Sequence, residues 1–284
     1  MSVPQLPKKK KMGAVSFLNT KPLIYGIEKN RFPHNFELTK EIPSSLAVQL
    51  NAGKLDVGLI PSIAYAKNSP SLRIVPECGI IAHDQVNSIR LYFNKDLKDI
   101  RTVAIDISSM TSVVLTKIIL AERFEMKPEF VAARPDLEKM LASADAALII
   151  GDSALFKTGS VAKNYLDLAE EWKDMTSLPF VFAVWAGRPE SIDMDDIQAI
   201  ISSKTLGQDN IDEVCREAAV EYRVDFSVVK SYLTENVQFD LGDQEIAGMR
   251  HFFELAYYHG ALEYLPLLNF YPLEATTTKP ASSN

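Results

Sequence analysis

The feature that most constrains the fold of this chain is the alternation of short β-rich runs with segments of helical spacing, which continues to about residue 187. Gly13–Phe17 and Val57–Ile60 have the composition of strands, and a helical pattern follows each of them. One such pattern, Pro43–Ala52, has proline in its first turn and glycine just past its end. This alternation is typical of βα units that form a parallel or mixed sheet with helices on its faces. We therefore predict an α/β fold with mixed sheets and flanking helices.

The order of the elements predicts how the chain is divided. One βαβ block ends near residue 90 and a second one ends near 178, whereas Met194–Tyr258 shows helical patterns only. We expect the strands at 88–93 and 179–186 to be the two crossings between two lobes. The first lobe is then discontinuous and the second is an insertion, with the boundaries 1–90 plus 185–284 and 91–184. A cleft between two such lobes is a common binding site for a small ligand.

Two details of the element assignment depend on local signals. Leu72–Val75 and Cys78–Ala82 are predicted to be separate strands, because Pro76 and Glu77 interrupt the apolar run. The helical region is expected to break near Gly207.

Composition excludes several partners. The 284 residues carry 30 Lys and Arg against 37 Asp and Glu, a formal net charge of −7, which argues against nucleic-acid binding. Lys8–Lys11 and the short apolar run Met12–Leu18 have the order of a signal peptide, but no small-residue cleavage site follows. No run approaches the roughly 20 apolar residues of a membrane span. We expect a cytoplasmic protein with no membrane partner, and Cys78 and Cys215 to be plain buried thiols.

Three strand-to-helix turns carry candidate binding groups, and the first is Ser16–Leu23. Asn19 and Thr20 lie at the start of a helix, where free N–H groups and the helix dipole favour anions, and Lys21 adds a positive charge. The alternative is that Asn19 or Thr20 merely caps the helix.

The second turn, Asp106–Ser112, has four hydroxyl-bearing residues before an apolar helix. One hydroxyl is enough for a cap, so the others, among them Ser109, Thr111 and Ser112, suggest that the turn binds a carboxylate or a phosphate. A serine-rich capped turn is the alternative. The turn is not a P-loop, because it contains no glycine and no GxxxxGK motif.

The third turn places Gly151 and Asp152 at the end of an apolar strand. Asp152 either caps the next helix or faces the cleft as a polar contact or a base. Ser62 and Ser88 complete the candidates for the cleft. Arg90 lies in an otherwise apolar strand, so it either binds a carboxylate, from the protein or a ligand, or faces the surface.

Other catalytic patterns are missing from the sequence. The histidines at 34, 83, 251 and 259 show no HxxxH or HExxH spacing, so we expect no metal site. Neither a GxSxG elbow nor a GxGxxG fingerprint occurs, so a serine hydrolase and a dinucleotide enzyme are unsupported. The residues alone therefore predict a polar, anion-suited cleft without saying whether it catalyses.

Five motifs in order along the chain resemble the chorismate dehydratase family of menaquinone biosynthesis by the futalosine route. They are Val15–Leu23, Asp56–Ile63, Ser108–Leu115, Leu148–Asp152 and Leu178–Trp185. The resemblance implies a two-lobed, periplasmic-binding-protein-like type 2 fold. It also implies a lyase that removes water from chorismate to give 3-[(1-carboxyvinyl)oxy]benzoate, with no cofactor.

For this reaction we form a hypothesis about particular residues. Asn19 and Asp152 are the catalytic candidates, and the substrate-binding candidates are Ser16, Lys21, Ser62, Ser88, Arg90, Ser109, Thr111, Ser112 and Phe182. In this reading the serine turn and Ser88 bind carboxylate, and Asn19 orients the substrate or assists departure of its hydroxyl. The base is either Asp152 or the enolpyruvyl carboxylate of the substrate itself.

Two other functions and one further partner remain open at this point. The related 1,4-dihydroxy-6-naphthoate synthase has the same fold, but it uses a histidine near the first motif, where this chain offers Asn19. A non-catalytic solute-binding protein also shares the fold. A homodimer is compatible with the sequence.

Overall fold

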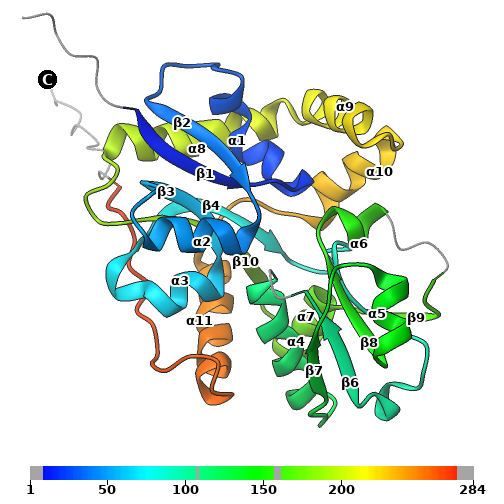
Figure 1. The fold of residues 1–284 in the computed structure, drawn as a ribbon. Coiled ribbons are helices and arrows are strands. Elements are labelled where there is room, and N and C mark those ends of the chain that lie inside the picture. The colour runs from blue at the N-terminus through cyan, green and yellow to red at the C-terminus, as the bar shows by residue number, and fades with distance from the viewer. Residues whose placement is uncertain (1–8, 107–108, 157–160, 274–284) are drawn as a thin grey trace, which may run out of the picture.

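The computed structural model describes residues 9–106, 109–156 and 161–273 and builds them around two sheets (Figure 1). In the described chain each sheet has five strands, in the orders β2-β1-β3-β10-β4 and β7-β6-β8-β5-β9. The first sheet consists of β1 (Lys10–Val15), β2 (Phe36–Glu41), β3 (Val57–Pro61), β4 (Arg73–Ala82) and β10 (Phe180–Gly187). The second consists of β5 (Ile89–Phe93), β6 (Thr102–Ile105), β7 (Glu129–Ala132), β8 (Ala146–Ile150) and β9 (Asn164–Asp167).

Both sheets are mixed, which confirms the predicted fold class. In the first sheet β1 runs parallel to β2 and β3, whereas β10 runs antiparallel to β3 and β4. In the second sheet β6 is parallel to β7 and β8, and β5 is antiparallel to β8 and β9. The antiparallel strands β5 and β10 are those that begin the second sheet and complete the first one.

The helices flank the sheets in the order of the chain. Those before the second sheet are α1 (Lys21–Glu28), α2 (Pro43–Asn51) and α3 (Ser62–Asn68). Those of the second sheet are α4 (Met110–Glu122), α5 (Leu137–Ser143), α6 (Asp152–Phe156) and α7 (Leu168–Thr176). The C-terminal ones are α8 (Met194–Asp209), α9 (Ile211–Tyr222), α10 (Phe226–Ser231), the π-helix η4 (Tyr232–Asn236) and α11 (Asp243–Tyr258). No helix within these residues is long and apolar enough to cross a membrane.

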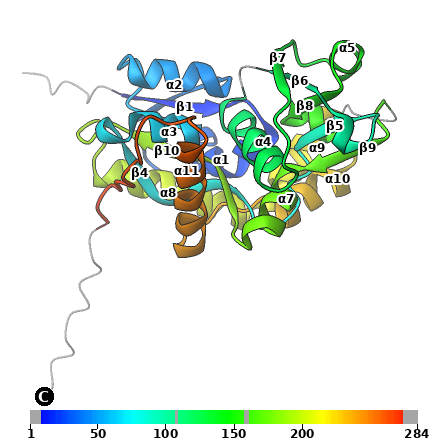
Figure 2. The ribbon, with the colours of Figure 1, turned by 90° about the horizontal axis from the view of Figure 1, so that it is seen from below.

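Two connections join the sheets. The chain leaves the first sheet after Ala82, enters the second at Ile89, and returns between Asp167 and Phe180. We keep the division into 1–90 plus 185–284 and 91–184 as a proposal; its cuts fall within β5 and β10. Figure 2 shows α4 of the second sheet beside α11, and α4 also contacts α3, so the helices of the two sheets meet directly.

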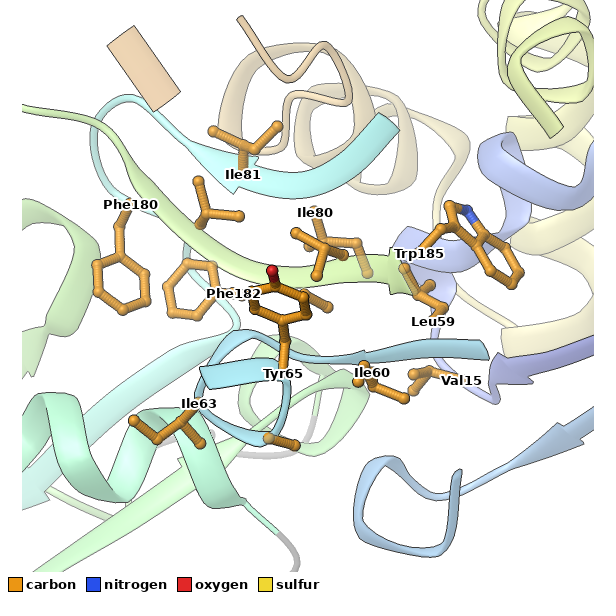
Figure 3. Packing of buried hydrophobic residues seen from close by; sticks show 14 of the residues in the cluster. Val15, Leu59, Ile60, Ile63, Tyr65, Ile80, Ile81, Phe180, Phe182 and Trp185 are labelled. Atoms are coloured by element: carbon orange, nitrogen blue, oxygen red, sulfur yellow. The ribbon is translucent and has the colours of Figure 1, made fainter. Parts of the chain in front are cut away.

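The core of the first sheet is continuous with the wall of the cleft. Figure 3 shows Phe180, Phe182 and Trp185 of β10 among apolar side chains of β3, β4 and α3. Trp185 is fully buried, and so are its strand partner Leu59 and Tyr65 of α3. The strand that carries Phe182 is therefore fixed on both sides by buried apolar surface, whose removal from water is the main driving force for folding.

One local prediction is wrong and another is confirmed. The expected strands 72–75 and 78–82 form one strand, β4, because Glu77 takes a left-handed conformation (φ 61°) that lets the strand continue past the interruption. Its register against β10 shifts at two places, so the irregularity is absorbed as bulges. The helix break expected near Gly207 is found at Asn210, between α8 and α9, and Gly207 itself packs closely on the start of α1.

Candidate functional site

A cavity lies where the first sheet meets the start of α4. Its lining comes from both sheets and from segments far apart in sequence: Val15, Phe17, Asn19, Pro43, Pro61, Ile80, Ser88, Ile89, Ser109, Met110, Thr111, Ser112, Ile150, Gly151, Phe182 and Ala183. Six of the eleven residues predicted for the site are among them, namely Asn19, Ser88, Ser109, Thr111, Ser112 and Phe182.

Asn19 lies in a short 3-10 turn (Leu18–Thr20) between β1 and α1. Its side chain is 7% exposed, and its Nδ2 donates to the hydroxyl of Tyr232 at 3.2 Å. Its Oδ1 is buried and has no hydrogen-bond partner among the described residues. A buried acceptor without a partner costs free energy, and a ligand that donates a hydrogen bond would remove that cost.

Ser88 lies in the first connection between the sheets, opposite Asn19. Its Oγ accepts a hydrogen bond from Tyr232 at 2.9 Å. The preceding residue, Asn87, has a left-handed backbone (φ 62°), and its N–H donates to the buried carboxylate of Asp167 at 2.7 Å. Asp167 also accepts the N–H of Val86 at 3.0 Å. The connection is therefore held firmly where Ser88 meets the cavity.

The start of α4 provides an environment suited to an anion. Ser109 is the N-cap of this 13-residue helix, yet its side chain makes no capping hydrogen bond. Its Oγ is buried and has no partner among the described residues, while Ser112 lies one turn further along the same wall. The N–H groups and the dipole at a helix start favour a negative charge. Ser108, which belongs to the same predicted turn, lies outside the described residues.

Thr111 connects the two sheets and also borders the cavity. Its Oγ1 donates to the carbonyl of Phe182 in β10 and accepts the N–H of Ile63 in α3, both at 3.3 Å. Ser62 is fully buried, with its Oγ 3.5 Å from Thr111 Oγ1. Ser62 therefore lies behind the wall and supports Thr111, and it is not among the residues that line the cavity.

Asp152 lies beside the cavity at the start of α6. Its Oδ1 accepts the N–H of Leu18 at 3.0 Å, and its carboxylate also takes a hydrogen bond from Tyr222. Burial raises the pKa of Asp152, although the donors from Leu18 and Tyr222 and the charge of Lys21 act in the opposite direction. Since Leu18 precedes α1 and Asp152 follows β8, this carboxylate joins segments of the two sheets.

The remaining predicted residues lie elsewhere. Lys21 forms an ion pair with Glu221 at 2.7 Å, and it lines a separate, polar hollow together with the exposed Ser16. The Nε of Arg90 lies 3.8 Å from Asp167, and the guanidinium stacks over the ring of Tyr165 at 4.3 Å. Of the alternatives left open for Arg90, the structure shows a carboxylate of the protein, that of Asp167.

Sequence reasoning missed Tyr232, which contacts both Asn19 and Ser88. It lies in the C-terminal helical region, where an aromatic residue at helical spacing is read as core. No local pattern marks its hydroxyl, because its partners are 213 and 144 residues away.

The cavity differs from a metal site or an acid–base site. The side chains described as lining it are all uncharged. Within the described ranges, no three His, Cys, Asp or Glu side chains cluster in a way that could hold a metal ion. What the geometry offers is a set of fixed hydrogen-bond donors and acceptors in a largely apolar enclosure.

Comparison with known proteins identifies the family of this chain. A family model described as menaquinone biosynthesis matches residues 10–258. The chain belongs to the menaquinone biosynthesis family. That match includes every residue that lines the cavity.

Curated relatives in this family carry an enzyme name. A chorismate dehydratase of Thermus thermophilus is 27% identical over 278 residues, which is 92% of this chain and 98% of the relative. A chorismate dehydratase of Campylobacter jejuni is 29% identical over 175 residues, 60% of this chain and 64% of the relative.

A solved structure identifies the fold. A Candida albicans protein described as having the generic periplasmic-binding-protein fold matches with a TM-score of 0.67. It is 14% identical, and the match covers 95% of this chain and 99% of that one. The family member described here therefore has the periplasmic-binding-protein-like fold that the sequence resemblance implied.

Proposed function

We propose that this protein is a lyase that dehydrates chorismate to 3-[(1-carboxyvinyl)oxy]benzoate. The observation that carries the proposal is that two residues lining a cavity of uncharged side chains at the start of α4, Asn19 and Ser109, each have a buried polar atom without a partner among the described residues. Membership of the menaquinone biosynthesis family and the names of two relatives support the same reaction.

The reaction needs positioning and charge stabilisation more than a reactive side chain. The C3–H bond and the bond from C4 to its hydroxyl break, the ring gains a double bond between these carbons, and the proton and hydroxide leave as water. Because the product ring is aromatic, the elimination is strongly downhill. The enzyme must hold two carboxylates and stabilise the negative charge that builds up on the ring carboxylate.

The start of α4 fits the ring carboxylate. Ser109 and Ser112 present hydroxyls there, and the dipole of a 13-residue helix points its positive end at the cavity. Donors that are already fixed in place stabilise developing charge without reorganising during the reaction. We assign the ring carboxylate to this wall, next to the apolar surface of Phe182.

Asn19 and Ser88 fit the reacting carbons on the other side. In this assignment Asn19 Oδ1 accepts a hydrogen bond from the C4 hydroxyl and orients its departure. Ser88 Oγ accepts from Tyr232, so its own proton is available to a carboxylate oxygen of the enolpyruvyl group on C3. Both side chains contact the hydroxyl oxygen of Tyr232, at 3.2 and 2.9 Å, so they lie side by side. The groups assigned to them are carried by the adjacent carbons C4 and C3.

The proton acceptor in this proposal is the enolpyruvyl carboxylate of the substrate. The described lining of the cavity has no ionisable side chain, and the carboxylate of Asp152, which follows the lining residue Gly151, is engaged by Leu18 and Tyr222. Asp152 is the protein alternative for this role. Ser16, Lys21, Ser62 and Arg90 are not assigned to the substrate in this arrangement.

Incubation of the purified protein with chorismate tests the proposal. We expect loss of the diene absorbance together with formation of the substituted benzoate, identified by mass. Binding of chorismate without turnover would favour a solute-binding protein instead. Inertness toward chorismate combined with formation of a naphthoate from a cyclised futalosine precursor would favour 1,4-dihydroxy-6-naphthoate synthase. A cytoplasmic location and a homodimer remain parts of the proposal, and fractionation and sedimentation measure them.

A further inference from the structure

Tyr232 lies directly behind the two polar residues proposed to hold the reacting carbons. It is 2% exposed and is not among the residues that line the cavity. Its hydroxyl contacts both Asn19 and Ser88, which come from the turn before α1 and from the connection between β4 and β5.

The hydrogen bonds at this hydroxyl have a defined direction. Tyr232 accepts a hydrogen bond from Nδ2 of Asn19 and gives its only proton to Oγ of Ser88. The amide of Asn19 is thereby turned so that Oδ1, the atom without a partner, is left for a ligand. The serine is left with its own proton to donate. One oxygen atom thus makes Asn19 an acceptor and Ser88 a donor toward the cavity.

The backbone holds Tyr232 in this place from both sides. It begins the π-helix η4, closed by the N–H of Val237 donating to the carbonyl of Tyr232 at 3.1 Å. The next residue, Gln238, exchanges two hydrogen bonds with Ile81 of β4, at 2.9 and 3.0 Å. The π-helix is a rare form that occurs frequently at functional sites. It is anchored here to the strand that precedes Ser88.

We propose that Tyr232 is a positioning residue that sets the hydrogen-bonding roles of Asn19 and Ser88 together. The proposal rests on the function proposed above, since those roles are the ones assigned to the C4 hydroxyl and the enolpyruvyl carboxylate. Burial raises the pKa of Tyr232, so its hydroxyl stays protonated at neutral pH and acts by hydrogen bonding, without exchanging a proton with the substrate.

Tyr232→Phe removes the hydroxyl and keeps the ring, and the chain offers a matched control. Tyr65 is also fully buried, and its hydroxyl also has two partners, the carbonyl of Leu267 and the N–H of Asn269, both at 2.9 Å. We expect Tyr232→Phe to lower kcat by about 10- to 100-fold, with KM changed by less than about threefold, because misaligned groups chiefly affect the chemical step. We expect Tyr65→Phe to leave kcat within about twofold. Equal kcat values for the two variants would overturn the proposal.

A double-mutant cycle separates positioning from general packing. If Tyr232 acts through Asn19 and Ser88, then adding Tyr232→Phe to a variant that carries both Asn19→Ala and Ser88→Ala should lower kcat by less than about threefold further. A full, independent loss of about 10-fold or more from that addition would contradict the proposed route.

The side-chain amide of Asn19 gives a readout that needs neither activity nor a Tyr232 variant. In the ligand-free, unaltered protein we expect this amide pair, assigned by its loss in Asn19→Ala, to show slowed hydrogen exchange and shifts unlike those of a solvated amide. A fast-exchanging pair with solvated shifts would overturn the proposal. If the unaltered protein failed to convert chorismate while the amide was protected, the proposed function would fail and the positioning of Asn19 by Tyr232 would stand.

Discussion

At the scale of single residues, the site depends on polar atoms that the fold leaves without partners. Asn19 Oδ1 and Ser109 Oγ are both buried and both unpaired within the described chain. Each such atom costs about 1–3 kcal/mol relative to a satisfied one. Natural proteins keep such costs where function needs them, so stability and activity are expected to respond in opposite directions when these atoms are removed.

Replacing Asn19 by alanine should nearly abolish turnover and leave the fold intact. The change removes the acceptor assigned to the C4 hydroxyl, so we expect kcat/KM to fall by at least about 100-fold, as for other fixed polar groups in active sites. Asn68→Ala is the control, because the amide of Asn68 also donates a hydrogen bond, to the carbonyl of Ala64 at 2.9 Å, but lies outside the cavity. Steady-state kinetics and thermal unfolding measure the two effects. An Asn19→Ala enzyme as active as the control would remove Asn19 from the active site.

Ser109→Ala should separate stability from binding. Since the hydroxyl has no partner in the ligand-free protein, we expect its removal to raise the free energy of unfolding by up to about 1 kcal/mol and to raise KM about tenfold. Ser203→Ala is the matched control, because Ser203 is equally buried but its Oγ accepts the N–H of Ile27 at 3.1 Å. That control should lose about 1 kcal/mol and keep its KM. Denaturant titration and kinetics check both, and a Ser109→Ala variant with lowered stability and unchanged KM would contradict the assignment.

The same residues show what the sequence reveals about a site. Asn19, Ser109 and Ser112 follow strands and begin helices, so local patterning marks them as candidates, and each of them lines the cavity. Lys21 and Arg90 carry equally strong signals, yet each pairs with a carboxylate of the protein, Glu221 and Asp167. Such pairing depends on contacts between distant segments, which no local pattern records. Tyr232 escaped prediction for the same reason.

At the scale of elements, the contact between α1 and α8 fixes the turn that carries Asn19. A Cβ atom added at Gly207 of α8 would lie 2.0 Å from the carbonyl oxygen of Pro22, so the helices approach here as closely as their backbones allow. The sequence predicts a helix break near Gly207, and the break lies at Asn210. Gly207 itself stays within α8, where its missing side chain permits the contact with α1.

Gly207→Ala should therefore destabilise the protein more than an ordinary buried glycine substitution. We expect a loss of about 2–3 kcal/mol, because backbone atoms must move to admit the methyl group. Gly58→Ala is the control: its added Cβ would meet its nearest neighbour, a methyl group of Ile60, at an ordinary 3.4 Å. Urea unfolding of both variants measures the difference. Equal stability of the two would show that α1 and α8 can separate without cost, and that their contact does not fix the turn.

At the scale of the whole molecule, the two sheets come from separate parts of the chain and meet at the cavity. The division into two lobes stays a proposal, and hydrogen bonds connect segments of the two sheets, among them the N–H of Ile63 to Thr111 and the N–H of Leu18 to Asp152. The order of strands and helices can be predicted from local sequence patterns, and this order is what predicts two lobes with a cleft between them. It does not predict these cross-links, which depend on how the lobes are placed.

Asp152 provides the sharpest test at this scale, because its two proposed roles give opposite results for one substitution. As a link between the lobes it needs only an oxygen that accepts the N–H of Leu18, 3.0 Å away. Asp152→Asn keeps such an oxygen but is not basic, so we expect kcat within about threefold of the unaltered enzyme. Asp152→Ala removes the link, and we expect KM to rise about tenfold because a competent closed arrangement becomes less populated.

If Asp152 instead takes the substrate proton, the asparagine variant should lose at least about 100-fold in kcat, and alanine should do no worse. Steady-state kinetics of both variants with chorismate decide between the roles. The expected order, asparagine active and alanine weakened in KM, leaves proton removal to a carboxylate of the substrate, in keeping with the uncharged lining of the described cavity. Catalysis in this protein then depends on how the two lobes position the enolpyruvyl carboxylate of the substrate near its C3 proton.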